Sequence, residues 1–489
     1  MTIHLGSIGG SRRVGRLVAT AAMLGLLLSA PAYASASASS PSDGVPMAAA
    51  KLTQVNVPGT TALGAAAVDL KAWGYTDREF YADGTANRYR GAVSGAEANA
   101  TVIDGNWPYR TRVLVDAPAP GHFNGTLVVE WTNVTIGVDA NFVFAEAHAD
   151  LLREGYAYAT VSVQKVGVDR DKSWSPKRYG TLSVDASNID PQGGGTIDAT
   201  DDPLSWDVFT QVAKALKANV GQDPPLPGLK VRNVIATGQS QSASRLTTYY
   251  NTIQPLDNFF NGFVLWDRAT SKLRPDLSVP AISVNSEALS LLYSPFGTSK
   301  YTREWEVSGT THGSIYAAQY VDAMFNRDKS LIGPNGQPES FTQWVEPSCS
   351  VLPAFSTVPT GLVIGAAMDS VRDWITTGRA AAPSIYFDRD ANGALIRDSD
   401  GNVEGGVRLS QFVAPTAAVD AFNGTAFPCS VSGSHRYYTP QELKARYLTH
   451  GAYVAQVAAA ALTAVKDGYE LPYDAAVAVK DAATSLVAR

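Results

Sequence analysis

Cysteine, clusters of basic residues and long apolar runs are all scarce in this chain of 489 residues. The formal net charge is −6, and no basic stripe with interleaved aromatic residues is present, so the sequence argues against a nucleic-acid partner. The apolar run at 17–30 is shorter than the ~20 residues that a membrane-spanning helix needs, so we expect no stable membrane span. No internal repeat is visible. Hydrophobic residues make up 45% of the chain and charged residues 17%, which is typical of a globular protein.

The chain has two cysteines, Cys349 and Cys429. Their spacing fits neither a zinc site nor a redox pair, and we expect neither a metal nor an organic cofactor. In an exported protein, two cysteines are expected to form a disulfide. We therefore predict a Cys349–Cys429 disulfide if the chain leaves the cytoplasm.

The N-terminal segment has the features of an export signal. Arg12, Arg13 and Arg16 precede the apolar run 17–30, and Ala32-Tyr33-Ala34 fits a cleavage site with small residues at its first and third positions. These features predict a secreted or periplasmic protein. An uncleaved anchor is the alternative interpretation.

The same segment sets the expected domain boundaries. Gly15 stands where the twin-arginine route usually has a bulky apolar residue, so the general secretory route is favoured. We predict a signal peptide over 1–34, a flexible lead-in over 35–50 and one α/β domain over 51–489.

Apolar runs alternate with helical patterns along most of the chain. Strands are expected within 88–117 and at 125–131, 156–163, 231–237, 261–266, 279–284 and 303–307. Helices are expected at 142–154, 203–220, 243–253 and within 439–488. This alternation predicts a mainly parallel sheet with helices on both faces. A polar, glycine-rich loop is expected at 165–200, and a loop-rich excursion or lid after residue 313, at about 320–430.

The segment 231–246 predicts a nucleophile elbow. The apolar strand ends in Gly238-Gln239-Ser240-Gln241-Ser242, and a helical pattern follows at once. Strand, Gly-x-Ser-x-small and helix form the context in which α/β-hydrolases hold a strained, reactive serine. We expect Ser240 to be the nucleophile, with Gly238 and Ser242 small because helix and strand pass close together. An ordinary turn with a surface serine is the alternative.

Serine needs a base, and the base needs an orienting acid. In α/β-hydrolases these follow the serine in the order acid, then histidine. Glu287, just after the strand 279–284, is the preferred acid, and Asp267 at the end of the preceding strand is the alternative. His312, in a loop of small residues after 303–307, is the preferred base.

Two later histidines, His435 and His450, are the alternatives to His312, each if residues 313–430 are a lid inserted before a last strand. His122 precedes its strand and His148 lies within a helix, so both are disfavoured. The oxyanion hole is expected to combine the backbone N–H of Gln241 with an N–H from the loop after 125–131, for which Asn133 is the candidate.

Six segments of the chain form a recognisable set: 128–133, 205–211, 237–246, 261–263, 305–312 and 405–409. Together they resemble a family of exported bacterial proteins called alpha/beta hydrolase domain proteins. The resemblance covers roughly residues 55–485 and implies that Ser240, Glu287 and His312 are nucleophile, acid and base. The family often has Glu-Thr-Asp where this chain has Glu287-Ala288-Leu289.

These features predict a secreted serine hydrolase that cleaves a carboxylic ester through an acyl-enzyme with a Ser-Glu-His triad. Its substrate is expected to be a small-molecule or polymer ester. An amidase or peptidase on the same fold is one alternative. A non-catalytic exported binding protein on a hydrolase scaffold is another, because a fold does not determine a function.

Overall fold

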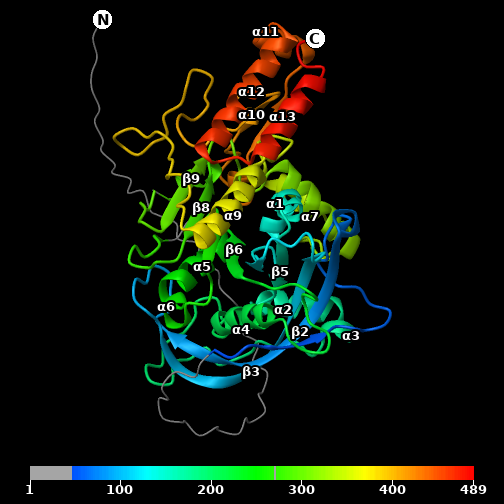
Figure 1. Cartoon of the computed structure of the whole chain (residues 1–489), viewed down its shortest axis with the longest axis vertical. Coiled ribbons are helices and arrows are strands. Elements are labelled where there is room, and N and C mark those ends of the chain that lie inside the picture. Colours follow the sequence, from blue (N-terminus) through cyan, green and yellow to red (C-terminus); the bar gives the residue numbers. More distant parts are fainter. Residues whose placement is uncertain (1–46, 269–270, 294) are drawn as a thin grey trace, which may run out of the picture. The chain divides into compact units, whose positions relative to one another are not determined.

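The computed structural model describes residues 47–268, 271–293 and 295–489. The main sheet of this part has the strand order β1-β2-β3-β5-β4-β6-β7-β8-β9 (Figure 1). Its strands are β1 (Lys51–Gln54), β2 (Tyr75–Arg90), β3 (Thr101–Pro118), β4 (Thr126–Trp131), β5 (Ala157–Val161), β6 (Asn233–Gln239), β7 (Gly262–Trp266), β8 (Ala281–Ser286) and β9 (Thr302–Val307).

The sheet is parallel from β5 through β4 and β6 to β9, whereas β1, β2 and β3 are antiparallel and form one edge. The predicted mainly parallel sheet is therefore confirmed. A second, small sheet pairs β10 (Ala417–Asp420) with β11 (Ser434–Tyr437).

Both faces of the parallel strands are covered. Alternate residues of a strand point to opposite faces, and on β4 Leu127 and Val129 belong to one apolar cluster whereas Val128 belongs to another. On the first face pack α4 (Ser205–Ala218) and α5 (Gln241–Thr252). On the second face pack α1 (Phe142–Arg153), α7 (Ile315–Asp328) and α9 (Thr360–Thr377), as Figure 1 shows.

Two segments predicted as loops contain helices. Residues 165–200 begin with α2 (Lys165–Trp174) and α3 (Pro176–Tyr179). Residues 320–430 include most of α7, together with α8 (Phe341–Val345), α9 and α10 (Ser410–Val413).

The long helix α9 was missed because its glycines resemble those of a loop. A Cβ on Gly361 would lie 2.1 Å from the Glu146 backbone oxygen, and one on Gly365 would lie 2.2 Å from the Asp150 carboxylate. The glycines therefore allow α9 to pack directly on α1. The part of the predicted excursion that forms α9 therefore belongs to the hydrophobic core.

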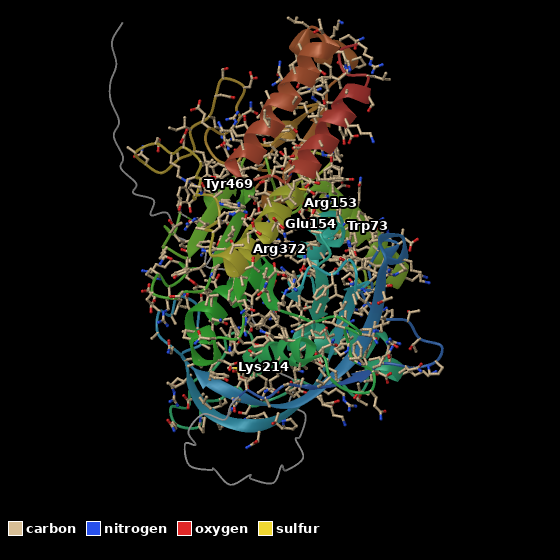
Figure 2. All side chains as sticks on the ribbon, viewed as in Figure 1. Trp73, Arg153, Glu154, Lys214, Arg372 and Tyr469 are labelled. Atoms are coloured by element: carbon tan, nitrogen blue, oxygen red, sulfur yellow. A yellow bond between two sulfur atoms is a disulfide. The ribbon has the colours of Figure 1, made fainter. Side chains whose placement is uncertain are left out.

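The chain ends in α11 (Pro440–Tyr447), α12 (His450–Asp467) and α13 (Pro472–Thr484), as predicted for 439–488. Arg153 of α1 pairs with Asp474 at 2.8 Å, and the Tyr469 ring packs against Trp305 at 5.1 Å between centroids. Figure 2 labels Arg153 and Tyr469. Among the described helices, none alone is long and apolar enough to cross a membrane, although α11 and α12, bent by 71°, meet that criterion together.

The N-terminal predictions fall largely outside the described residues. The signal peptide predicted for 1–34 lies outside them entirely, and so does 35–46 of the predicted lead-in. Residues 47–50 are described and are not a free tail: Met47 and Ala50 are each 7% exposed, and the Ala50 N–H donates to Gln211 of α4 at 2.9 Å. At this end of the predicted lead-in the chain is anchored, because the side chains of Met47 and Ala50 join the core whereas those of Ala48 and Ala49 are exposed.

A buried carboxyl ties β4 to α1. Glu130 is 1% exposed and accepts hydrogen bonds from the Val143 N–H at 2.9 Å and the Tyr158 hydroxyl at 2.7 Å. Burial raises the pKa of Glu130 from 4.5 to about 8. The folded state therefore binds this proton more tightly than the unfolded chain. The stability that Glu130 contributes is complete below pH 4.5 and is lost as the pH rises through about 8.

We expect Glu130→Gln to remove this pH dependence. The unfolding free energy of the wild type relative to the variant should fall by up to about 1.4 kcal/mol per pH unit between those two pKa values. Urea unfolding of both proteins across this pH range measures the difference. Parallel stability curves would contradict the assignment, whatever the absolute effect of the substitution.

Candidate active site

Ser240 stands at the sharp bend between β6 and α5. Its backbone has φ 57° and ψ −115°, a conformation that L-residues rarely adopt, and its N–H donates to the Trp266 carbonyl at 2.9 Å. A Cβ on Gly238 would lie only 2.9 Å from the Ser242 hydroxyl and 3.2 Å from Leu246. The helix thus passes as close to the strand as the sequence implied, and the Ser240 side chain is partly open to solvent.

Ser242 occupies the position that is usually glycine, and the structure shows why a serine fits. It is fully buried, and its hydroxyl donates to the Gln239 carbonyl at 2.9 Å and accepts from the Gln239 N–H at 3.0 Å. The hydroxyl therefore pairs with both backbone groups of Gln239 at the strand end, and the carbonyl also accepts from the Asn133 side-chain nitrogen at 3.0 Å.

His312 is oriented by Asp267. The Nδ1 atom of the imidazole lies 2.7 Å from the Asp267 carboxylate. Asp267 directly follows β7, has φ 54° and is 1% exposed. Ser286, at the end of the neighbouring strand β8, donates to the same carboxylate through its N–H at 2.5 Å and its hydroxyl at 2.9 Å. The carboxylate is thereby held rigidly against the ring.

The preferred prediction of Glu287 as the acid is corrected by this geometry. Glu287 is buried, but it accepts from the Gly309 N–H at 2.8 Å and from Arg397 at 2.8 Å, and it makes no hydrogen bond to His312. Burial raises the pKa of Glu287. Because the chain turns into a short helix directly after β8, the Glu287 side chain braces the loop that carries His312 and does not reach the ring. The alternative acid, Asp267, is the one in contact.

The other histidines of the described chain are occupied elsewhere. His435 is 4% exposed on β11, with Nδ1 2.8 Å from the Phe355 carbonyl, and His450 contacts the Val487 carbonyl at 2.9 Å. His122 contacts Leu152 and His148 contacts Ala145, both through backbone carbonyls. Of the described histidines, only His312 lines the same pocket as Ser240.

A chain of amides defines the tautomer of His312. The Asn133 side-chain oxygen accepts from the Thr135 N–H at 2.8 Å, so its nitrogen donates to Gln239 Oε1 at 2.9 Å. Gln239 Nε2 therefore faces His312, where it donates to the carbonyl oxygen at 3.1 Å and lies 3.1 Å from ring Nε2. Ring Nε2 is then the unprotonated acceptor, and Nδ1 carries the proton that is shared with Asp267.

Of the two predicted oxyanion donors, only one is available. The N–H of Gln241 lies at the first turn of α5, where no intrahelical acceptor exists. The N–H of Asn133 already donates to the Ala140 carbonyl at 2.9 Å, so this part of the prediction is wrong. The N–H groups of Val134 and Ile136, on the same loop, donate to no acceptor in the described part of the chain.

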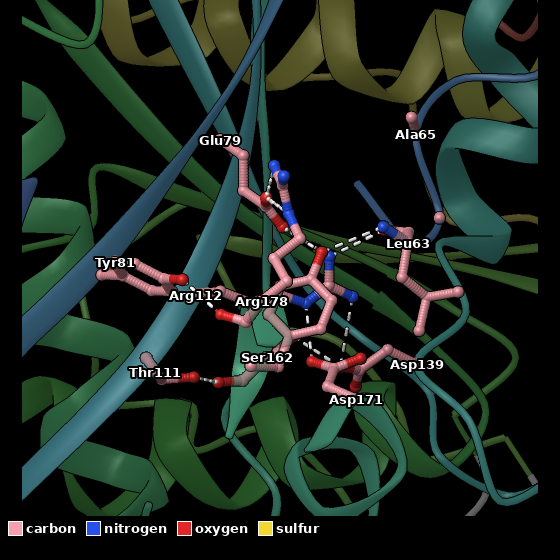
Figure 3. A network of polar contacts seen from close by, with 12 residues as sticks. Leu63, Ala65, Glu79, Tyr81, Thr111, Arg112, Asp139, Ser162, Asp171 and Arg178 are labelled. Atoms are coloured by element: carbon pink, nitrogen blue, oxygen red, sulfur yellow. Dashed lines mark hydrogen bonds and ion pairs between the residues drawn. The ribbon is translucent and has the colours of Figure 1, made fainter. Parts of the chain in front are cut away.

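A buried charge network holds this loop through Asp139, and Figure 3 shows the network. Asp139 accepts from the Thr132 hydroxyl at 2.7 Å. It also pairs with Arg112 at 3.8 Å, and Figure 3 labels both residues. Arg112 also pairs with Asp171 at 2.6 Å and with Glu79 at 3.3 Å. The loop between β4 and α1 is thus anchored on both sides of Asn133 to charges that cannot move without losing their partners.

The pocket beside Ser240 has an empty volume of about 550 Å³, which includes its open mouth. The predicted Cys349–Cys429 disulfide is present, with the two Cα atoms 5.0 Å apart. It joins the two segments, 341–355 and 427–432, that form the outer walls of the pocket. These pocket walls were not recognised in the sequence, because their aromatic residues lie in the segment interpreted as loop-rich.

The chain matches a known protein family over residues 41–480. That family is described as "Alpha/beta hydrolase domain". No curated protein matches the chain.

Solved structures with a similar arrangement include three esterases or hydrolases. Esterase Est22 has 13% identity and a TM-score of 0.30, over 53% of this chain and 78% of its own. A serine hydrolase without lid, XC6422 from Xanthomonas campestris, has 12% identity and a TM-score of 0.28, over 45% and 86%. A rice cell wall degrading esterase, LipA from Xanthomonas oryzae, has 11% identity and a TM-score of 0.25, over 46% of this chain and 51% of its own.

Proposed function

This chain belongs to the alpha/beta hydrolase domain family, and we propose that it is a serine hydrolase that cleaves carboxylic esters through an acyl-enzyme. The family match and the sheet topology confirm the predicted α/β-hydrolase fold. The observation that carries the proposal is a strained serine at the carboxyl edge of the parallel sheet, in one pocket with a histidine whose Nδ1 is held by a buried aspartate.

In the proposed reaction, Ser240 Oγ attacks the ester carbonyl carbon while His312 Nε2 accepts the hydroxyl proton. Asp267 holds the ring in the required tautomer and stabilises the imidazolium that forms. The N–H of Gln241, with one N–H of the loop 134–136, stabilises the oxyanion, an effect worth about 3–4 kcal/mol per donor. His312 then returns the proton to the departing alcohol, and water hydrolyses the acyl-enzyme through the same base.

During this cycle Gln239 must release its contact with ring Nε2 of His312. Its amide contacts Nε2 of His312, whereas no hydrogen bond joins Ser240 to that nitrogen among the described residues. A ring nitrogen has a single lone pair, so Ser240 and Gln239 compete for it. The second hydrogen bond of Gln239, to the His312 carbonyl, allows the amide to stay in place while Ser240 takes over the lone pair.

Export is part of the same proposal. The arginines and apolar run of residues 12–30 fit a signal peptide, and a disulfide is the usual state of paired cysteines outside the cytoplasm. A substrate outside the cytoplasm, either a small molecule or a polymer ester, agrees with both features.

A fluorophosphonate probe tests the proposed chemistry directly. We expect one equivalent of probe to bind the folded protein covalently, with the adduct on Ser240 by peptide mapping, because the probe reacts only with an activated serine. Heat-denatured protein is the matched control and should not be labelled. An unlabelled, correctly folded protein would contradict the proposal, and so would an adduct on another serine.

A further inference from the structure

The pocket beside Ser240 is apolar and carries no charged wall. None of the described residues that line it is a lysine, arginine, aspartate or glutamate, and His312 is the titratable side chain among them. A charged group placed there would lose its hydration without gaining a partner, at a high cost. The apolar side chains of the lining are those of Ile136, Phe142, Ala317, Ala318, Phe341, Trp344, Phe355, Phe427, Pro428 and Val431.

Aromatic rings form a continuous cluster from the base of this pocket to its mouth. Phe341 contacts Phe142 at 5.5 Å, Phe355 at 5.8 Å and Trp344 at 6.1 Å between centroids. Trp344 contacts Phe427 edge-on at 6.2 Å. Phe142 and Phe355 are buried, whereas Phe427 is 58% exposed. We call these five residues the aromatic wall.

Phe427 is an unusual member of this wall, because so much of a large apolar side chain faces solvent beside an open pocket. Apolar surface that is exposed at a pocket mouth is commonly a site of ligand contact. The segment that carries Phe427 is held in place by the Cys349–Cys429 disulfide. The same segment is also bonded to His312, the proposed catalytic base, because the His312 N–H donates to the Val431 carbonyl at 2.9 Å.

We propose that this pocket binds an uncharged, apolar arm of the ester, either an aromatic ring or an alkyl chain, and that Trp344 and Phe427 set the preference for it. The inference rests on the proposed esterase function and specifies its substrate class. Esters whose corresponding arm carries a carboxylate or an ammonium group are disfavoured, since nothing on the pocket walls pairs with either charge.

The test uses three p-nitrophenyl esters that share one leaving group: the acetate, the hexanoate and the monoester of adipic acid. We expect kcat/KM for the hexanoate to exceed that for the acetate by at least about 10-fold, because a buried methylene in an apolar pocket discriminates by that order. The adipate monoester, which places a carboxylate where the hexanoate has a methyl group, should be at least about 10-fold slower than the hexanoate.

Phe427→Ala should lower the hexanoate-to-acetate ratio by about 10-fold. Leu462→Ala removes another side chain that is mostly exposed, 69%, on α12 outside the pocket, and should leave the ratio at its wild-type value. An unchanged ratio in Phe427→Ala, or equal turnover of adipate and hexanoate, would overturn the inference.

Fluorophosphonate titration of each variant counts its reactive sites and separates the two ways to fail. Labelling of Ser240 without an apolar preference leaves the esterase proposal intact and refutes only the pocket assignment. A folded protein that neither labels nor turns over any of the three esters refutes the esterase proposal, and the pocket assignment with it.

Discussion

Replacing Asp267 by asparagine is expected to lower kcat for ester hydrolysis by about 10⁴-fold with little change in KM. Loss of the orienting carboxylate has an effect of that size in serine hydrolases, because the imidazole adopts the wrong tautomer and its charged form is no longer stabilised. Asp267 meets the structural requirement, since its carboxylate is 2.7 Å from His312 Nδ1. Steady-state kinetics on p-nitrophenyl acetate measure the effect.

Glu287→Gln is the matched control. Like Asp267, Glu287 is a buried carboxylate that follows a strand of the sheet, but its hydrogen-bond partners are Gly309 and Arg397. We expect it to lower the melting temperature and to leave kcat within about 10-fold of the wild type, because it acts on the His312 loop and not on the ring. A 10⁴-fold loss in Glu287→Gln with an active Asp267→Asn enzyme would reverse the assignment.

Replacing Ser240 by alanine is expected to have the largest effect of all, a loss of about 10⁶-fold in kcat, because the acyl-enzyme can no longer form. Substrate binding should be nearly unchanged, since the pocket walls and the N–H of Gln241 remain. Single-turnover measurements at high enzyme concentration give the rate of ester hydrolysis. Titration with a competitive ligand counts the folded sites. Wild-type activity in Ser240→Ala would show that Ser240 is not the nucleophile. The measured activity would then come from another site, and the pocket beside Ser240 would at most bind a ligand.

The double variant Ser240→Ala/Asp267→Asn sharpens this result. Residues that act as one unit are strongly non-additive, so the double variant should be no slower than Ser240→Ala alone. If Asp267 instead contributed only to stability, its effect would multiply with that of Ser240, and the double variant would be slower by the full factor of the single change.

The parallel sheet and the elbow could be predicted because their signals are local. The apolar run that became β6, Gly238 and the small residue Ser242 lie within a few positions of Ser240, and the backbone at Ser240 has the strained conformation that they imply. The helix α9 could not be predicted in this way. Its glycines are explained only by the packing of α1, because a Cβ on Gly361 would lie 2.1 Å from the Glu146 backbone oxygen.

The acid was decided by the spatial arrangement. Asp267 and Glu287 both follow strands of the parallel sheet, so strand order alone admits either. The choice depends on the left-handed backbone of Asp267, directly after β7. It also depends on Ser286 of the next strand, whose N–H holds the Asp267 carboxylate in place. Asn133 failed as a backbone donor for a related reason, because its N–H pairs with Ala140 across the loop.

The sequence by itself determined the fold class, which the family match confirms, and it indicated the proposed nucleophile and base, since these depend on residue types at short spacing and on chain order. Only the tertiary structure decided which acid meets the imidazole, which N–H groups remain free and what lines the pocket. Those contacts join segments that are far apart in the chain, 45 residues for His312 and Asp267 and 80 for Cys349 and Cys429. Their geometry exists only once the sheet has brought the strand ends together.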